Sequence, residues 1–123
     1  MTRINCVPPQ ELHQKHLVAE YRELPRVFAL AHAAMKRGEK PTDSRNPKDY
    51  ILGTGHVRFF YPRLGYLRRR FAELVAEMMS RGYEPKHLTV PKVDLPNEWF
   101  TDWEPDAKAL KLNRERIALR TPK

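Results

Sequence analysis

Apolar residues in the first third of the chain recur with the period of an α-helix. Beyond about Glu11 they follow one another at spacings of four and three residues, as Leu17, Tyr21, Leu24, Phe28 and Ala31. This stripe predicts an amphipathic helix with one buried face. Pro25 lies inside the stripe, where it removes one backbone hydrogen bond and should bend the helix. We expect the helix to stop at Gly38, because glycine is common just after helix ends.

Two further segments have helical spacing. Residues 64–81 carry a second stripe, and Gly82 is expected to end that helix. Its members are Leu64, Leu67, Phe71, Leu74 and Met78. A third helix should start at Pro105, a residue type favoured in the first turn, and run to about Arg120. Asp106, near its start, suits the positive end of the helix dipole.

Proline-rich segments separate these helices. Residues 1–10 should be extended, and residues 38–63 and 83–104 read as loops. Residues 57–61 (VRFFY) could form a short strand, but no second strand is available for pairing, so buried irregular structure is favoured. The prediction is an all-α, compact single domain over residues 1–123, with three helices joined by long irregular loops.

The charge of the chain points to an anionic polymer. Lys and Arg number 23 against 15 Asp and Glu, which gives a net charge of +8. A phosphate polymer is the first partner to consider, although a basic surface can also serve solubility alone. Nothing in the sequence resembles a membrane span, a signal peptide or a broad lipid-facing helix, so no membrane partner is expected. We expect a monomer in the cytoplasm, associated with the nucleoid.

Opposite the first apolar stripe, the helix presents a polar face with His16, Arg22, Glu23 and Arg26. Arg22 and Arg26 are four residues apart, and Glu23 and Arg26 are three apart, so these side chains share a surface. From spacing alone, a solvated face with ion pairs within the helix is the better interpretation, because such faces are common.

The exact order of residues in two blocks favours a functional interpretation of this face over a solvated one. MTRIN is followed by HLVAEYRELPRVF and then by ILGTGHVRFFYPRLGYLRRR. These blocks strongly resemble the phage endonuclease V family of pyrimidine-dimer DNA glycosylases, and the likeness covers roughly residues 1–80. It is weaker through the second long loop and the third helix.

The resemblance implies a compact three-helix domain in which the N-terminal segment threads back between helices. It implies that the nucleophile is the α-amine of Thr2, exposed when Met1 is removed, and that Glu23 is the catalytic glutamate. The family's DNA-contacting residues match Arg3, His16, Arg22 and Arg26. The expected substrate is double-stranded DNA with damaged pyrimidines or abasic sites. The family's aromatic, basic C-terminal tail has no counterpart here, which leaves two alternatives: specificity for pyrimidine dimers, or a broader set of damaged pyrimidines or abasic sites.

An α-amine suits this chemistry because its ordinary pKa is about 7.7–8.0, so part of it is unprotonated at neutral pH. It can attack C1′ of the sugar, release the base and form an imine that permits β-elimination at the 3′ phosphate, with Glu23 assisting. The protein would then be a DNA glycosylase with AP-lyase activity. The alternative is a non-catalytic, basic DNA-binding protein on the same fold. An RNA-binding module finds no supporting signature.

Several other motifs have ordinary structural explanations. The turn before His56 lacks the Lys-Ser/Thr ending of a phosphate-binding loop, and His56 is expected to be structural. No metal and no cofactor are predicted, because the spacing of Cys6, His13 and His16 fits no zinc pattern. Trp99, Phe100 and Trp103 should cap the core. For two groups of arginines, the sequence does not decide between contact with phosphate and a charge that faces solvent. At least one arginine of the first group is expected to face solvent. They are Arg68, Arg69 and Arg70 on the second helix, and Arg114, Arg116 and Arg120 on the third.

Overall fold

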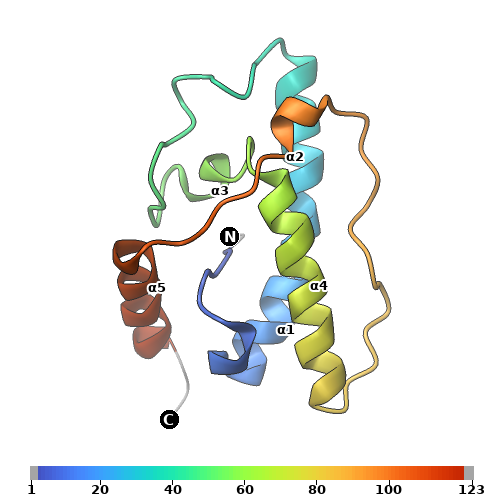
Figure 1. The fold of residues 1–123 in the computed structure, drawn as a ribbon, viewed down its shortest axis with the longest axis vertical. Coiled ribbons are helices and arrows are strands. Elements are labelled where there is room, and N and C mark those ends of the chain that lie inside the picture. The colour runs from blue at the N-terminus through green and yellow to red at the C-terminus, as the bar shows by residue number, and fades with distance from the viewer. Residues whose placement is uncertain (1–2, 121–123) are drawn as a thin grey trace.

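The computed structural model describes residues 3–120, which form a helical fold without a β-strand in that range. The long helices are α1 (Gln14–Glu23), α2 (Pro25–Lys36), α4 (Leu64–Ser80) and α5 (Ala107–Arg120). The short elements are η1 (Pro9–Glu11), α3 (His56–Phe59) and η2 (Asn97–Trp99). Figure 1 shows α4 running alongside α1, with α5 on the other side of the N-terminal segment. The predicted all-α class is confirmed.

The predicted bend in the first helical segment lies between α1 and α2. Only Leu24 separates the two helices, and its N–H still donates to the carbonyl of Glu20 at 2.8 Å. Pro25 has no N–H to continue the series, so the next helix begins with proline in its first turn. The apolar stripe continues across the break, and Leu17, Leu24 and Phe28 are fully buried.

The ends of the helices largely follow the sequence signals. Gly38 and Gly82 have φ values of +94° and +92°, a region where side chains are unfavourable, and they follow the last turns of α2 and α4. The start of the last helix differs slightly from the prediction. It begins at Ala107, because the carboxylate of Asp106 accepts a hydrogen bond from the Ala109 N–H at 2.8 Å and caps the helix.

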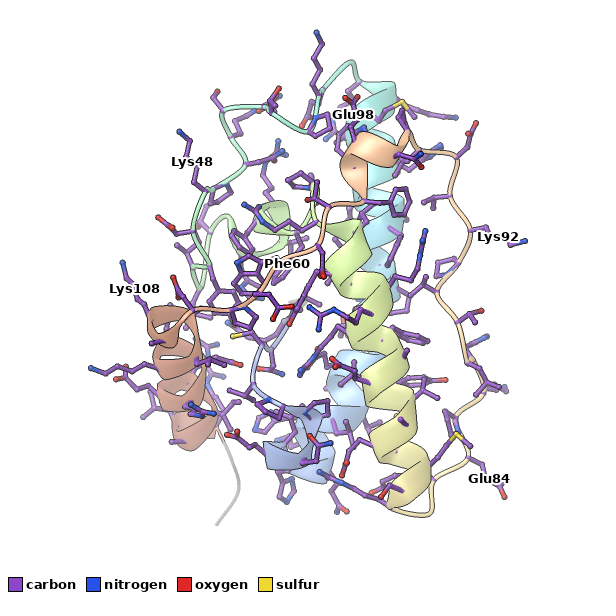
Figure 2. All side chains as sticks on the ribbon, in the orientation of Figure 1. Lys48, Phe60, Glu84, Lys92, Glu98 and Lys108 are labelled. Carbon is purple, nitrogen blue, oxygen red and sulfur yellow. The ribbon has the colours of Figure 1, made fainter. Side chains whose placement is uncertain are left out.

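The segment 57–61 corrects one expectation. It is neither a strand nor irregular, since its first residues belong to the single helical turn α3. The rings of Phe59 and Phe60 are fully buried and meet those of Tyr50 and Trp103. Figure 2 shows Phe60 inside the molecule, while Lys48, Lys92 and Lys108 point outward at its edge. Trp99 is buried as well, so the aromatic cluster before α5 does cap the core.

The described residues before η1 form a buried, extended segment, residues 4–7. It lies between the α1–α4 pair and α5 (Figure 1). No helix in residues 3–120 is long and apolar enough to cross a membrane.

Candidate functional site

The polar face at the α1–α2 junction holds three of the predicted site residues. Glu23, the last residue of α1, forms an ion pair with Arg26 in the first turn of α2, with 3.0 Å between Oε2 and the guanidinium. The Glu23 side chain is 27% exposed and that of Arg26 is 67% exposed, while Arg22 is also exposed. Glu23 lies just before the N-terminus of α2, where the helix dipole favours a negative charge. The junction therefore offers one partly exposed carboxylate paired with a guanidinium group, with the exposed Arg22 one residue before it in the sequence.

A second group of basic side chains gathers where α5 approaches the N-terminal segment. Burial lowers the pKa of Arg3, and the positive charges of Arg116 and Arg120 lower it further, with the Tyr50 hydroxyl opposing them. Burial also lowers the pKa of His16, and the neighbouring His13 acts in the same direction. The backbone of Arg120 acts in the opposite direction and raises the pKa of His16, so it lies near the ring. Arg3, His16 and the end of α5 are thus close neighbours.

Two atoms of this group, His16 Nε2 and Arg116 Nε, are buried and have no hydrogen-bond partner among residues 3–120. A buried polar atom left without a partner costs free energy, so a bound group that supplies a hydrogen bond would be stabilised here. This is consistent with the predicted contact between His16 and DNA.

A buried polar network ties the N-terminal segment to three helices. Glu20 of α1 binds Arg70 of α4 through two hydrogen bonds, 2.8 and 3.0 Å long, and both side chains are almost completely buried. Glu20 Oε1 also accepts from the Asn5 side-chain amide at 2.9 Å. Asn113 of α5 donates to the Asn5 side chain at 2.8 Å and accepts from the N–H groups of Cys6 and Val7.

This network directs the described part of the N-terminal segment toward the junction. The N-terminal segment and α1 run in opposite directions past the contact between Asn5 and Glu20 (Figure 1). Going back from Asn5 to Arg3, and forward from Glu20 to Glu23, therefore leads toward the same end of α1. Thr2, the predicted nucleophile, lies outside the described residues.

The structure shows different contacts for the arginines of the two groups whose roles the sequence did not decide. Arg70 is neither a phosphate contact nor a solvent-facing charge, because it is buried against Glu20. Arg69 is paired with Asp102 and Glu104, and the guanidinium of Arg68 lies over the Phe100 ring. On α5, Arg114 binds Glu11 at 2.8 Å. Arg116 and Arg120 are the members of this group that lie near Arg3, and Arg116 has the larger effect on its pKa.

Glu20, Arg70, Asn5 and Asn113 are the residues of this region that sequence analysis missed. A signal did exist for the charged pair. Glu20 lies three residues after Leu17 and four before Leu24, and Arg70 lies three after Leu67 and four before Leu74, so both charges fall on apolar stripes. Two opposite charges on two core-facing stripes predict a buried pair. No comparable pattern marks the two asparagines.

Metal chemistry and thiol chemistry find little support in this region. Within residues 3–120, no group of three or more His, Cys, Asp or Glu side chains is placed to hold a metal ion. Cys6 is buried, and burial raises the pKa of its thiol to about 12. The thiol is therefore protonated at neutral pH and unsuited to act as a nucleophile.

A comparison with known protein families gives the site its context. The family model described as pyrimidine dimer DNA glycosylase matches residues 1–90, which include the N-terminal segment, α1, α2 and α4. All of the predicted site residues fall within the match. The resemblance seen in the sequence is thereby confirmed, and the chain belongs to the pyrimidine dimer DNA glycosylase family of DNA-repair enzymes.

Proposed function

We propose that the protein excises damaged pyrimidines from double-stranded DNA and then nicks the strand, with the α-amine of Thr2 as the nucleophile. The amine nitrogen attacks C1′, the glycosidic bond breaks, and its electron pair leaves with the base, which takes up a proton. The product is an imine between Thr2 and the opened sugar. Loss of a C2′ proton then breaks the bond between C3′ and its oxygen, and the 3′ phosphate departs.

The observation that carries the proposal is the course of the N-terminal segment. A buried, hydrogen-bonded segment runs along α1 toward the end at which Glu23 and Arg26 lie. Arg3, adjacent to Thr2 in the sequence, lies among positive charges. Like charges favour the neutral form of an amine, which is the nucleophilic form. The N-terminal segment and the α1–α2 junction together support an amine nucleophile that is assisted by one carboxylate.

Glu23 is assigned two roles in this scheme. As a carboxylate it stabilises the positive charge that develops on the sugar as the glycosidic bond breaks. It then accepts and returns protons during imine formation and elimination. Its partial exposure leaves room for a substrate, and its ion pair with Arg26 holds it on the exposed face of the junction.

Arg3, His16, Arg22 and Arg26 are assigned to the DNA backbone. Guanidinium groups make paired hydrogen bonds to phosphate oxygens, which fix the duplex in place without reading its sequence. His16 has a buried Nε2 that lacks a hydrogen-bond partner among residues 3–120 and could accept or donate one to DNA. Arg116 joins this set because it lies near Arg3. Such clamps hold a duplex bent, and damaged sites are cheaper to deform than intact ones.

A borohydride trap tests the proposal. Borohydride reduces an imine to a stable amine, so reaction with duplexes containing a cyclobutane dimer, another damaged pyrimidine or an abasic site should give a covalent adduct. Peptide mass mapping should locate it at Thr2. Chain that retains Met1 is the matched control, because its Thr2 nitrogen is an amide and cannot form an imine. Salt-sensitive DNA binding without any adduct would contradict the proposal and favour the non-catalytic DNA-binding protein.

A further inference from the structure

The backbone of Ile4 is held on both sides by buried side chains. Its N–H donates to Nε2 of His56 at 2.8 Å, and its carbonyl oxygen accepts from the Tyr50 hydroxyl at 2.9 Å. The rings of His56 and Tyr50 meet edge to face, with 5.5 Å between centroids and 77° between planes. Ile4 therefore cannot shift along the segment without breaking at least one of two mutually supporting hydrogen bonds.

Only one form of the His56 ring fits this arrangement. Nδ1 lies 2.7 Å from the carbonyl oxygen of Ile51, which can only accept, so Nδ1 carries the proton. Nε2 is then a bare acceptor, as the Ile4 N–H requires. A doubly protonated ring would turn an N–H toward the N–H of Ile4 and abolish the contact.

The surroundings of His56 favour this neutral form. The ring is 1% exposed, and burial is the main reason that its pKa is lowered. The positive charges of Arg3 and Arg116 also lower the pKa, while the hydrogen bond that His56 donates to the Ile51 carbonyl and the charge of Glu20 oppose them. The remaining ring neighbours, Tyr50 and Phe60, are aromatic.

The place of this contact gives it a consequence for chemistry. The N–H groups of Cys6 and Val7 are bound by Asn113, which holds the part of the segment nearer to η1. His56 binds the part nearer to the chain start, because Ile4 is only two residues from Thr2. Reaction rates depend steeply on the position of the nucleophile, and a displacement of about 1 Å can lower the rate about 100-fold.

We propose that His56 is a positioning residue of the reaction, which directs the start of the chain at the damaged sugar by holding the Ile4 N–H. This role rests on the proposed function, because it requires that the Thr2 amine is the nucleophile. A histidine that only fills the core would contribute to stability, and its effect would not depend on which of its two hydrogen bonds is kept.

Two substitutions separate the hydrogen bonds. His56→Gln places an amide oxygen near the position of Nε2, where it can accept from Ile4, and this side chain does not titrate. His56→Asn places its amide near the position of Nδ1, where it can reach Ile51 but falls short of Ile4. Both variants are polar and smaller than histidine, so their effects on the core are similar and each serves as the other's control.

Three measurements on each full-length protein without Met1 give the answer. The first is the single-turnover rate of borohydride-trapped adduct formation on a saturating abasic-site duplex. The second is the Kd for the same duplex with a tetrahydrofuran abasic analogue, which cannot form an imine. The third is amide hydrogen exchange at Ile4 together with that of core amides in α4. It reports the hydrogen bond between Ile4 and His56 separately from global folding.

We expect His56→Asn to slow adduct formation by about 10- to 100-fold. Its Kd and the hydrogen exchange of the core amides in α4 should be nearly unchanged, while the Ile4 amide should exchange rapidly. His56→Gln should restore the rate to within about threefold of the wild-type protein. Adduct formation by His56→Asn at the wild-type rate, or equal slowing in both variants, would overturn the positioning role. No adduct from the wild-type protein would instead overturn the amine mechanism and this role together.

Discussion

At the scale of single residues, Glu23 is the side chain whose chemistry can be tested most directly. Glu23→Gln keeps the shape and the hydrogen-bonding capacity toward Arg26 but removes the charge and the ability to take up protons. We expect the single-turnover rate of strand cleavage to fall by about 100-fold or more. The Kd for undamaged duplex should stay within a few-fold, because a carboxylate does not attract phosphate.

The informative comparison for Glu23→Gln is Glu77→Gln. Glu77 also pairs with an arginine of its own region, Arg81 at 2.7 Å, but on α4. This control should cleave at the wild-type rate. Cleavage by Glu23→Gln at the same rate as the control would remove Glu23 from the reaction.

A second prediction for a single residue concerns the contribution of Arg26 to DNA affinity. Its side chain is 67% exposed, so it can leave Glu23 for a phosphate at little cost. Each phosphate contact on duplex DNA contributes about 0.9 to the slope of log K against log salt concentration. Arg26→Ala should therefore weaken binding and flatten that slope by about one, as measured by titrations at several salt concentrations.

Arg69→Ala is the matched control for Arg26→Ala. Arg69 already lies against Asp102 and Glu104, so its charge is compensated within the protein and should release few counterions from DNA. Its removal should leave the slope unchanged. Equal slopes for the Arg26→Ala and wild-type proteins would exclude Arg26 from the phosphate contacts.

At the scale of elements, the buried pair of Glu20 and Arg70 joins α1 to α4. Removing one partner leaves a charge without compensation in the core, which costs about 3–5 kcal/mol, whereas removing both often costs little. We expect Arg70→Met to lower the free energy of unfolding by that amount. The double variant with Glu20→Leu should recover part of it, although Asn5 loses a hydrogen-bond acceptor.

Urea unfolding of the four proteins in this double-mutant cycle measures the coupling. A coupling of at least about 1 kcal/mol is expected because the two side chains share two hydrogen bonds. Additive effects of the two substitutions would show that the pair contributes no more than its separate parts. The cycle also tests how firmly the N-terminal segment is held, since Asn5 depends on Glu20.

The helices were predictable from sequence because their signals are local. Stripe spacing, Pro25 and the two glycines at Gly38 and Gly82 act through backbone geometry within one or two turns. The turn α3 was not predictable in this way. Four residues are too few to show a helical period, and the aromatic residues that favour strands are here buried by contact with distant Tyr50 and Trp103.

The candidate site was predictable only in part, for the same reason. Glu23 and Arg26 are three residues apart, so spacing alone brings them together. Arg3 and Arg116 meet only through the fold, because Asn113 of α5 binds the segment that follows Arg3. Such a contact spans more than a hundred residues and leaves no periodic pattern. Resemblance to a family supplied Arg3, but not the part that α5 contributes.

At the scale of the whole molecule, stability should decline in two steps as the pH falls. The pKa values of His16 and His56 are lowered from the ordinary value of 6.5, so the unfolded chain binds protons there that the folded chain does not. Their contribution is complete above pH 6.5 and is lost as the pH falls from 6.5 through the lowered values. A second loss should begin below about pH 4.5. There the unfolded chain takes up a proton at Glu39 before the folded chain does, because the hydrogen bond from Arg58 is the main cause that lowers the pKa of the folded carboxyl.

Urea unfolding between about pH 8 and about pH 3 separates the two steps. His56 is deeply buried and should contribute a slope of up to about 1.4 kcal/mol per pH unit in the first step, while water screens the smaller effect of His16. His56→Gln cannot titrate, so most of the first step should disappear while the second stays. If the wild-type protein shows no change between pH 6.5 and pH 5, His56 is not held neutral by the fold. The single tautomer inferred from its two hydrogen bonds would then be wrong.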